Sequence, residues 1–471
     1  MLEREFDDAY HEDVAELIEH YEKMVKDNAN CFFEEASFDQ ILDYYEQRQN
    51  FKKAREVVDL AILQHPFSAS FLVRKAQILF ESKEFDFALD LLDKAEIFDA
   101  TDTNIYLLRS DIFVWMGKYQ RAVDTIRTAI SISEKEELPD LYLELADIYE
   151  EWEKFDEVFD CLVRTLDANP ANEEALNRIW FCVEFTEKYQ ESIDFHTKFI
   201  DNEPYSYLAW FNLAHAYAGL DLYEKAVESF EFVMAINDNY EYAYKDCGEI
   251  LFKLGQFEKA AEYFLKASVL SKPYKELYFS IGECYEKIQN YNRARYYFRK
   301  ATNLDPYFDE AYFKIGLNYE VEERWESALS AYERAYKLDN ENPGYTIALA
   351  NAYRQNNDNG RAIEFYQRAV ELQPDDKDNW LDLAYCHFIN EQYRDAINTL
   401  DLAALNFENG SDICYTRSAF YFAVGNKNEA YLNLERGLLQ NYKQHKMLFE
   451  LAPSMKMDEQ VVRIIDQYRK N

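Results

Sequence analysis

Apolar and small residues recur along this chain at offsets that repeat every 34 residues. In the copy that opens at Lys275, they stand at positions 4, 7, 8, 11, 20, 24, 27 and 32, as Tyr278, Ile281, Gly282, Tyr285, Ala294, Phe298, Ala301 and Pro306. Positions 4, 7, 8 and 11 share one face of a helix, and positions 20, 24 and 27 form the matching face of a second helix. Each copy therefore predicts a helical hairpin, with helices over about its first fourteen residues and from about position 18 to 31.

The same register extends over twelve copies. They open at Glu35, Ala69, Thr103, Pro139, Glu173, Tyr207, Glu241, Lys275, Asp309, Pro343, Lys377 and Ser411. All intervals are 34 residues except one of 36, where Ser133 to Leu138 lengthens a loop. No linker rich in Gly, Pro or Ser interrupts the periodicity. We therefore expect one elongated repeat domain over residues 35–444, in which stacked hairpins bury a continuous core.

The period and the residue types at these offsets resemble the tetratricopeptide repeat (TPR) family. The resemblance implies an all-α solenoid, a right-handed superhelix whose first helices line the concave surface. Small residues at positions 8 and 20 would let the two helices of a hairpin approach closely. Val158 and Ser192 replace the usual alanine at position 20 of the fourth and fifth copies, so we expect slightly wider packing there.

Both ends of the chain depart from the pattern. In residues 1–34 we expect an acidic tail and a capping helix over residues 10–27, and in residues 445–471 two short helices that close the last hairpin. Capping of a repeat array explains both ends. The alternative is that one of them recruits a partner.

Composition narrows the functional classes. The formal net charge of −38 argues against nucleic acid as a direct ligand, because phosphate binding needs clustered Lys and Arg. The sequence has neither an apolar leader nor an apolar run long enough to span a bilayer, so we expect a cytoplasmic protein without membrane insertion. The seven cysteines form no C-x-x-C pair, which favours reduced thiols that pack between helices.

The sequence contains no recognisable catalytic or cofactor motif. It has no phosphate-binding G-x-x-x-x-G-K-[ST] and no H-E-x-x-H, and its histidines are scattered. His196 and His387 stand at packing positions, so we interpret them as core residues, whereas His215 at position 9 should face the concave side. We predict no catalytic residue, metal site or cofactor, and therefore no enzyme.

The concave face predicted from the resemblance comprises positions 2, 5, 9, 12 and 13. Acidic residues dominate positions 9 and 12, namely Asp43, Asp111, Asp147, Glu249, Glu283, Glu46, Glu150, Glu184, Glu286 and Glu320. They are opposed by Lys245, Lys253, Lys287 and Arg354. Residues 132–160, with twelve carboxylates and two lysines, form the most negative segment.

Aromatic residues recur at position 5 of the same face. They are either packing residues or exposed anchors for a partner's side chains. The anchor interpretation predicts a partner-binding site in the sixth to ninth copies, made of Phe211, His215, Glu249, Phe252, Phe279, Glu283, Glu286, Phe313 and Glu320.

One way in which TPR proteins bind a ligand depends on particular residues, which can be compared with this sequence. Members that hold the C-terminal carboxylate of heat-shock chaperones use Lys, Asn and Arg at fixed positions of three successive repeats. Here Lys245 is followed by Glu249, and the next copies offer Ser280, Glu310 and Lys314, so this clamp is not matched. Two hypotheses remain: an adaptor or chaperone-like receptor that holds a basic and hydrophobic protein segment, or a rigid scaffold subunit that binds by its outer faces or ends. The sequence leaves the oligomeric state open.

Overall fold

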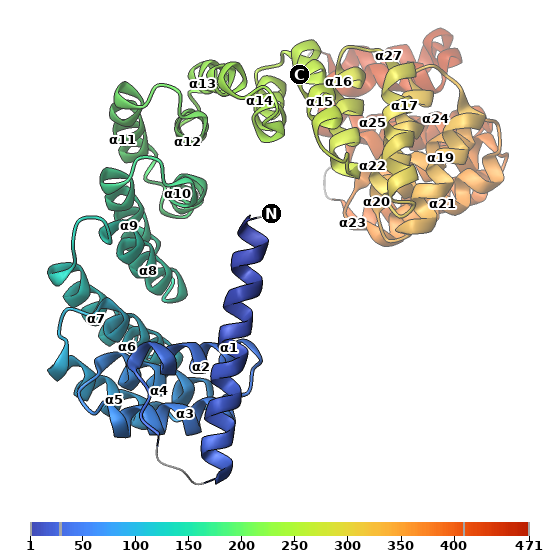
Figure 1. Ribbon diagram of the computed structural model, residues 1–471. Helices are drawn as coiled ribbons and strands as arrows, with labels where there is room; N and C mark the ends of the chain where they lie inside the picture. Colours follow the sequence, from blue (N-terminus) through green and yellow to red (C-terminus); the bar gives the residue numbers. More distant parts are fainter. Residues whose placement is uncertain (1, 28–30, 408–409, 470–471) are drawn as a thin grey trace. The chain divides into compact units, whose positions relative to one another are not determined.

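The computed structural model describes residues 2–27, 31–407 and 410–469, with the backbone alone for residues 2–13. Every regular element in these residues is a helix, so the predicted all-α class is confirmed (Figure 1). The helices divide into two compact units, residues 1–238 and 239–471. The continuity of one domain and the handedness of a superhelix stay predictions.

The first unit contains a long N-terminal helix and six hairpins. Their bounds are α1 (Leu2–Asp27), α2 (Glu35–Gln47), α3 (Phe51–Gln64), α4 (Ala69–Glu81), α5 (Phe85–Phe98), α6 (Thr103–Trp115), α7 (Tyr119–Ile132), α8 (Leu138–Glu151), α9 (Phe155–Ala168), α10 (Glu173–Thr186), α11 (Tyr189–Asn202), α12 (Tyr207–Gly219) and α13 (Tyr223–Ile236). Within this unit, α8, α10 and α12 lie on the inner side of the curve, and α9 and α11 lie on the outer side (Figure 1).

The second unit continues the alternation with six further hairpins and a C-terminal cap. Its hairpin helices are α14 (Glu241–Lys253), α15 (Phe257–Leu270), α16 (Lys275–Lys287), α17 (Tyr291–Leu304), α18 (Asp309–Glu320), α19 (Trp325–Leu338), α20 (Pro343–Gln355), α21 (Asn359–Leu372), α22 (Lys377–Ile389), α23 (Tyr393–Asn406), α24 (Ser411–Ala423) and α25 (Lys427–Asn441). The cap consists of η1 (Tyr442–Met447), α26 (Leu448–Leu451), η2 (Pro453–Met457) and α27 (Glu459–Tyr468). Val461 and Ile464 of α27 are buried against the last hairpin.

Close approach within a hairpin depends on the small residue at position 8. In α16, a Cβ added to Gly282 would lie 2.6 Å from the ring of Phe298 in α17. In α18, the same addition to Gly316 would lie 2.3 Å from the ring of Tyr332. Phe298 and Tyr332 are fully buried, so their rings fill the space that the missing side chains leave.

The turn inside each hairpin uses a left-handed residue at position 15. Nine of these residues are not glycine, among them Gln289 with φ 60° and Glu391 with φ 58°, and the other three are Gly117, Gly255 and Gly425. A side chain in this region costs about 1–2 kcal/mol relative to glycine. The sequence pattern gave no sign of this shared conformation, because most copies have a residue other than glycine at position 15.

The fifth copy departs from the other hairpins. Trp180 stands at position 8 of α10, where eleven other copies carry Leu, Ala, Ser or Gly. Helix α10 makes few contacts with α11 and packs instead on α9 and α12. A large side chain at this position explains the separation, because two helix backbones cannot approach around an indole ring.

The N-terminal helix extends further than the sequence pattern indicated. Its predicted start was residue 10, whereas α1 begins at Leu2. No Pro or Gly between residues 2 and 9 ends the helix there. Further along α1, Ile18, Tyr21 and Met24 are buried against the first hairpin.

Candidate functional site

Cations at position 6 link the first helices of adjacent copies. Arg74 of α4 forms ion pairs with Asp43 and Glu46 of α2. Lys314 of α18 lies 3.2 Å from Glu283 and 3.6 Å from Glu286 of α16. The expectation that only four basic residues oppose the acidic face was therefore wrong, because position 6 also points toward the carboxylates of the preceding copy.

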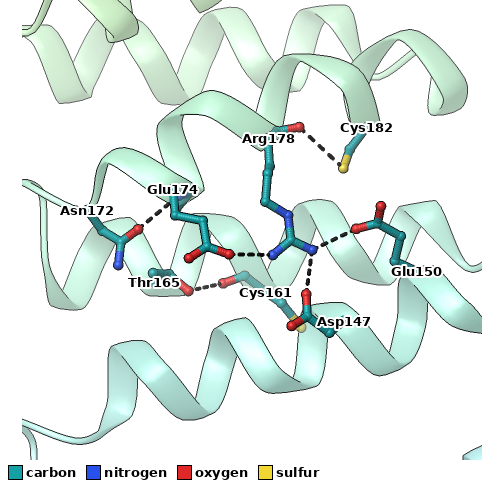
Figure 2. Close-up of polar contacts among 9 residues, drawn as sticks. Asp147, Glu150, Cys161, Thr165, Asn172, Glu174, Arg178 and Cys182 are labelled. Carbon is teal, nitrogen blue, oxygen red and sulfur yellow. Dashed lines mark hydrogen bonds and ion pairs between the residues drawn. The ribbon is translucent and has the colours of Figure 1, made fainter.

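Arg178 of α10 makes the most extensive of these links (Figure 2). Its Nη2 atom lies 2.6 Å from both Asp147 and Glu150 of α8, and its Nη1 atom lies 3.0 Å from Glu174 one turn earlier in α10. Asn172 accepts a hydrogen bond from the amide of Ala175 and so fixes the start of α10. Three carboxylates thus share one guanidinium, and the surface keeps a net negative charge.

A pocket of about 600 Å³ lies over this network. It is lined by Asp147, Glu150, Glu151, Glu174 and Arg178. A second pocket, of about 360 Å³, lies between earlier first helices of the same unit and includes Glu46, Arg74 and Asp111.

The junction between α6 and α8 lacks a cation at position 6. Glu144 stands there, and within the described part of the chain no Lys or Arg lies within ion-pair distance of Glu144 or Asp111. Loss of hydration raises the pKa of both groups, and the carboxylates of Asp111 and Asp147 raise the pKa of Glu144 further. Two carboxylates that repel each other at this junction would both be stabilised by an external cation.

Exposed aromatic rings follow the charged network along α10. Phe181 and Phe185 are 42% and 58% exposed. Their ring centroids lie 4.7 Å apart, and Phe185 stacks on Phe155 of α9 at 4.8 Å. Phe181 also contacts Trp180, which stacks on His215 at 5.4 Å. Glu174, Arg178, Phe181 and Phe185 are spaced by four, three and four residues, so one face of α10 carries both the charges and the rings.

The nine residues of the predicted site divide between the two units. Phe211 and His215 lie on α12 of the first unit, and the other seven lie on α14, α16 and α18 of the second. In the second unit the structure brings Glu283 and Glu286 together around Lys314. Glu249 lies 3.6 Å from Lys245, and burial raises the pKa of its carboxyl group. Glu320 accepts a hydrogen bond from the hydroxyl of Tyr332.

The aromatic residues of that site are more buried than anchors should be. Phe211 is 5% exposed and Phe279 is 9% exposed. Phe279 packs on Phe298 and Phe308, at 5.2 and 5.0 Å. The expectation of exposed rings at position 5 was therefore wrong for these two residues, because the second helix of the same copy covers them. Phe252 and Phe313 are half-buried against Phe257 and Tyr345 respectively.

The site predicted from the sequence, in the sixth to ninth copies, left out the charged residues and exposed rings of α10, although a signal was present. Trp180 was the largest departure from the small residue at position 8, and Phe181 and Phe185 follow it in the same helix. Departures from a repeat pattern at neighbouring positions indicate a surface that packing alone does not require.

The described residues contain neither a candidate membrane-spanning helix nor a candidate metal-binding group. None of their helices combines the length and the apolar character that crossing a lipid bilayer requires. Nor do His, Cys, Asp and Glu side chains in these residues gather into a group of three that could hold a metal ion.

Family models match several parts of the chain. Models described as tetratricopeptide repeat match residues 38–104, 207–240, 247–269 and 275–308. A model described as anaphase-promoting complex, cyclosome, subunit 3 matches residues 322–403. None of these models describes an enzyme family. A comparison with curated proteins found no match.

Several solved structures resemble parts of the chain. YrrB, described as a TPR protein with an unusual peptide-binding site, is 20% identical over 38% of this chain and 93% of its own, with a TM-score of 0.35. The Cut9–Hcn1 hetero-tetramer of the APC/C is 14% identical over 79% of this chain and 86% of its own, with a TM-score of 0.32. The C-terminal part of a TPR repeat-containing protein from Cytophaga hutchinsonii is 16% identical over 51% of this chain and 98% of its own, with a TM-score of 0.45.

The matched models and the helical hairpins agree on the period, the residue types and the fold. Repeats of this kind support a role as a protein–protein interaction scaffold or adaptor. The chain belongs to the tetratricopeptide repeat family.

Proposed function

We propose that this protein is a non-catalytic adaptor that holds a basic and hydrophobic segment of a partner protein against α8 and α10 of the first unit. The observation that carries the proposal is the shared face of α10. On that face an acidic pocket adjoins a pair of exposed phenylalanine rings that pack against each other.

Charge selects the kind of segment. Asp147, Glu150 and Glu174 share a single guanidinium, and the carboxylates of Asp111 and Glu144 have no cation of their own in the described residues. Lysine or arginine side chains of a partner would form ion pairs with these carboxylates, as Arg74 and Lys314 do with the carboxylates of the preceding copy elsewhere in the chain. Charges at the rim of such a surface mainly raise the association rate and set orientation.

The rings supply the affinity. Phe181 and Phe185 are held in place by Phe155 and Trp180, so a partner's apolar side chain would meet a surface that is already ordered. Removal of a buried aromatic anchor typically costs about 2 kcal/mol or more of binding free energy. Phe279 is a poorer test residue, because its truncation would open a cavity inside the repeat.

The test begins with affinity capture on the wild-type chain and mass spectrometry to identify a partner. The affinity of its segment is then measured for wild type, for Phe181→Ala/Phe185→Ala and for Asp111→Asn/Glu144→Gln. The ring variant should lose at least about thirtyfold in affinity. The amide variant should bind more slowly, with a difference that shrinks as salt is raised. Phe67→Ala, at a residue of the first repeats that is 77% exposed, is the control and should bind as wild type does.

The alternative is a rigid scaffold subunit that contacts its partners by outer faces or ends. Unchanged affinity in both the ring variant and the amide variant, together with loss of binding in variants on second helices, would favour it over the adaptor.

A further inference from the structure

The second helix of the eighth copy is unusual in this acidic chain. Helix α17 carries Arg293, Arg295, Arg299 and Lys300 and no carboxylate. The whole chain has 89 acidic and 51 basic residues, so a helix of this charge is a local reversal. Arg295 is buried and pairs with Glu322 at 3.0 Å, which leaves three cations toward the surface.

Tyrosine rings hold these cations in place. The Nζ atom of Lys300 lies 4.9 Å from the ring of Tyr278 and 5.0 Å from that of Tyr296. Arg293 donates a hydrogen bond of 3.2 Å to the hydroxyl of Tyr285. Arg299 donates one of 2.5 Å to the hydroxyl of Tyr319. Within the described ranges, no carboxylate forms an ion pair with these three cations.

The arrangement of Lys300 recurs in the neighbouring copies. Lys266 of α15 lies 5.2 Å from the ring of Tyr244, and Arg334 of α19 lies 5.6 Å from the ring of Tyr312. These three cations share position 26, and their rings share position 4. Because α15 to α19 pack successively, position 26 places the three cations in one row along three consecutive second helices. We call this row, together with Arg293 and Arg299, the basic ridge.

A cation over an aromatic face keeps its charge and its free donors while its side chain is restrained. Less entropy is then lost when it binds an anion. We propose that the basic ridge is a docking surface for an acidic segment of a partner protein. It lies in the second unit and uses no residue of α8 or α10, so it stands apart from the proposed function.

Charge decides between the conceivable occupants. A second copy of the chain would bring a further net charge of −38, which opposes self-association. Nucleic acid extends well beyond one short ridge and would meet repulsion from the carboxylates around it, such as Glu262 of α15 and Glu333 of α19. A short segment rich in Asp and Glu can pair with the ridge and stay clear of the rest of the surface.

The repeat offers a matched control. Arg164 of α9 also stands at position 26, and its guanidinium lies 5.9 Å from the ring of Tyr142 at position 4. However, α9 carries Asp156, Glu157, Asp160 and Asp167, so its surroundings are acidic. Lys300→Glu and Arg164→Glu change the net charge equally and disturb the same contact, but only the first alters the ridge.

The experiment measures fluorescence anisotropy of a short labelled peptide rich in glutamate, with the full chain and at low salt. Lys300→Glu should weaken binding about tenfold and Arg164→Glu should leave it unchanged. Lys300→Gln, which keeps most of the side chain, should show a smaller loss in the same direction. Equal effects of the two Glu variants would overturn the proposal. So would failure of the wild type to bind this peptide, or binding of a single-stranded DNA of similar length in its place.

Discussion

Burial of His196 in α11 makes the fifth repeat sensitive to acid. Its imidazole is fully buried at position 24, where the sixth to tenth copies carry Phe or Tyr. The Nδ1 atom lies 2.8 Å from the carbonyl oxygen of Ser192, to which Nδ1–H can donate, and Nε2 has no hydrogen-bond partner among the residues that the structure describes. Protonation would therefore add both a charge and an unpaired N–H donor inside the core. Burial accordingly lowers the pKa of His196 to about 4.

The magnitude follows from linkage. An unfolded histidine has a pKa near 6.5, so between pH 6.5 and about 4 the unfolded chain binds the proton and the folded chain does not. This contribution to stability is fully present above pH 6.5 and is lost as the pH falls toward 4. The difference between the two pKa values corresponds to about 3 kcal/mol in total, of which about 2 kcal/mol is lost by pH 5.

The assay compares wild type with His196→Phe, which introduces the residue type that the sixth to eighth copies carry at this position. Urea unfolding is followed at pH 7 and pH 5, together with hydrogen exchange of peptides from α10 and α11. The carboxylates titrate alike in both proteins, so the difference between them isolates the histidine. The variant should gain about 2 kcal/mol relative to wild type on going from pH 7 to pH 5, with slower exchange in α11. An equal response of both proteins to pH would refute the reasoning.

Three further predictions concern packing, turns and thiols. Gly316→Ala should lower the free energy of unfolding in urea by about 1–3 kcal/mol, because the added methyl group would clash with the ring of Tyr332. Gly360→Ala is the control and should be far better tolerated, because the nearest atom to its added methyl group, Oδ1 of Asp358, is 3.7 Å away. Gln289→Gly should raise the unfolding free energy by about 1 kcal/mol by relieving the left-handed turn, and a decrease would contradict that account. The five buried cysteines should react with a thiol reagent more slowly than Cys31 and Cys414. Burial shields these thiols and, for example, raises the pKa of Cys182 to about 11. Equal reaction rates in the native chain would show that packing does not shield them.

The repeating part of the fold was predictable because each helix pair uses the same few residues. Gly282 at position 8 and Phe298 at position 24, for example, lie on the two helix faces that the pattern predicted. The exposure of Phe279 was not predictable from its position, since it depends on how closely the second helix covers the first. Nor did the pattern reveal that Arg178 and Lys314 reach back to the preceding copy, because their partners lie about thirty residues away in sequence. Local periodicity fixes a hairpin, whereas surface chemistry depends on how neighbouring hairpins stack.

Site-specific photo-crosslinking tests the adaptor proposal most directly. A benzophenone amino acid is placed at position 181 on α10 in one variant and at position 67, in the turn after α3, in another. Each variant is irradiated with the partner segment that affinity capture identifies. If the partner binds against α10, crosslinks should form from position 181, on a basic and hydrophobic stretch of the segment, and none should form from position 67. Crosslinks from position 67 with none from position 181 would contradict the proposal.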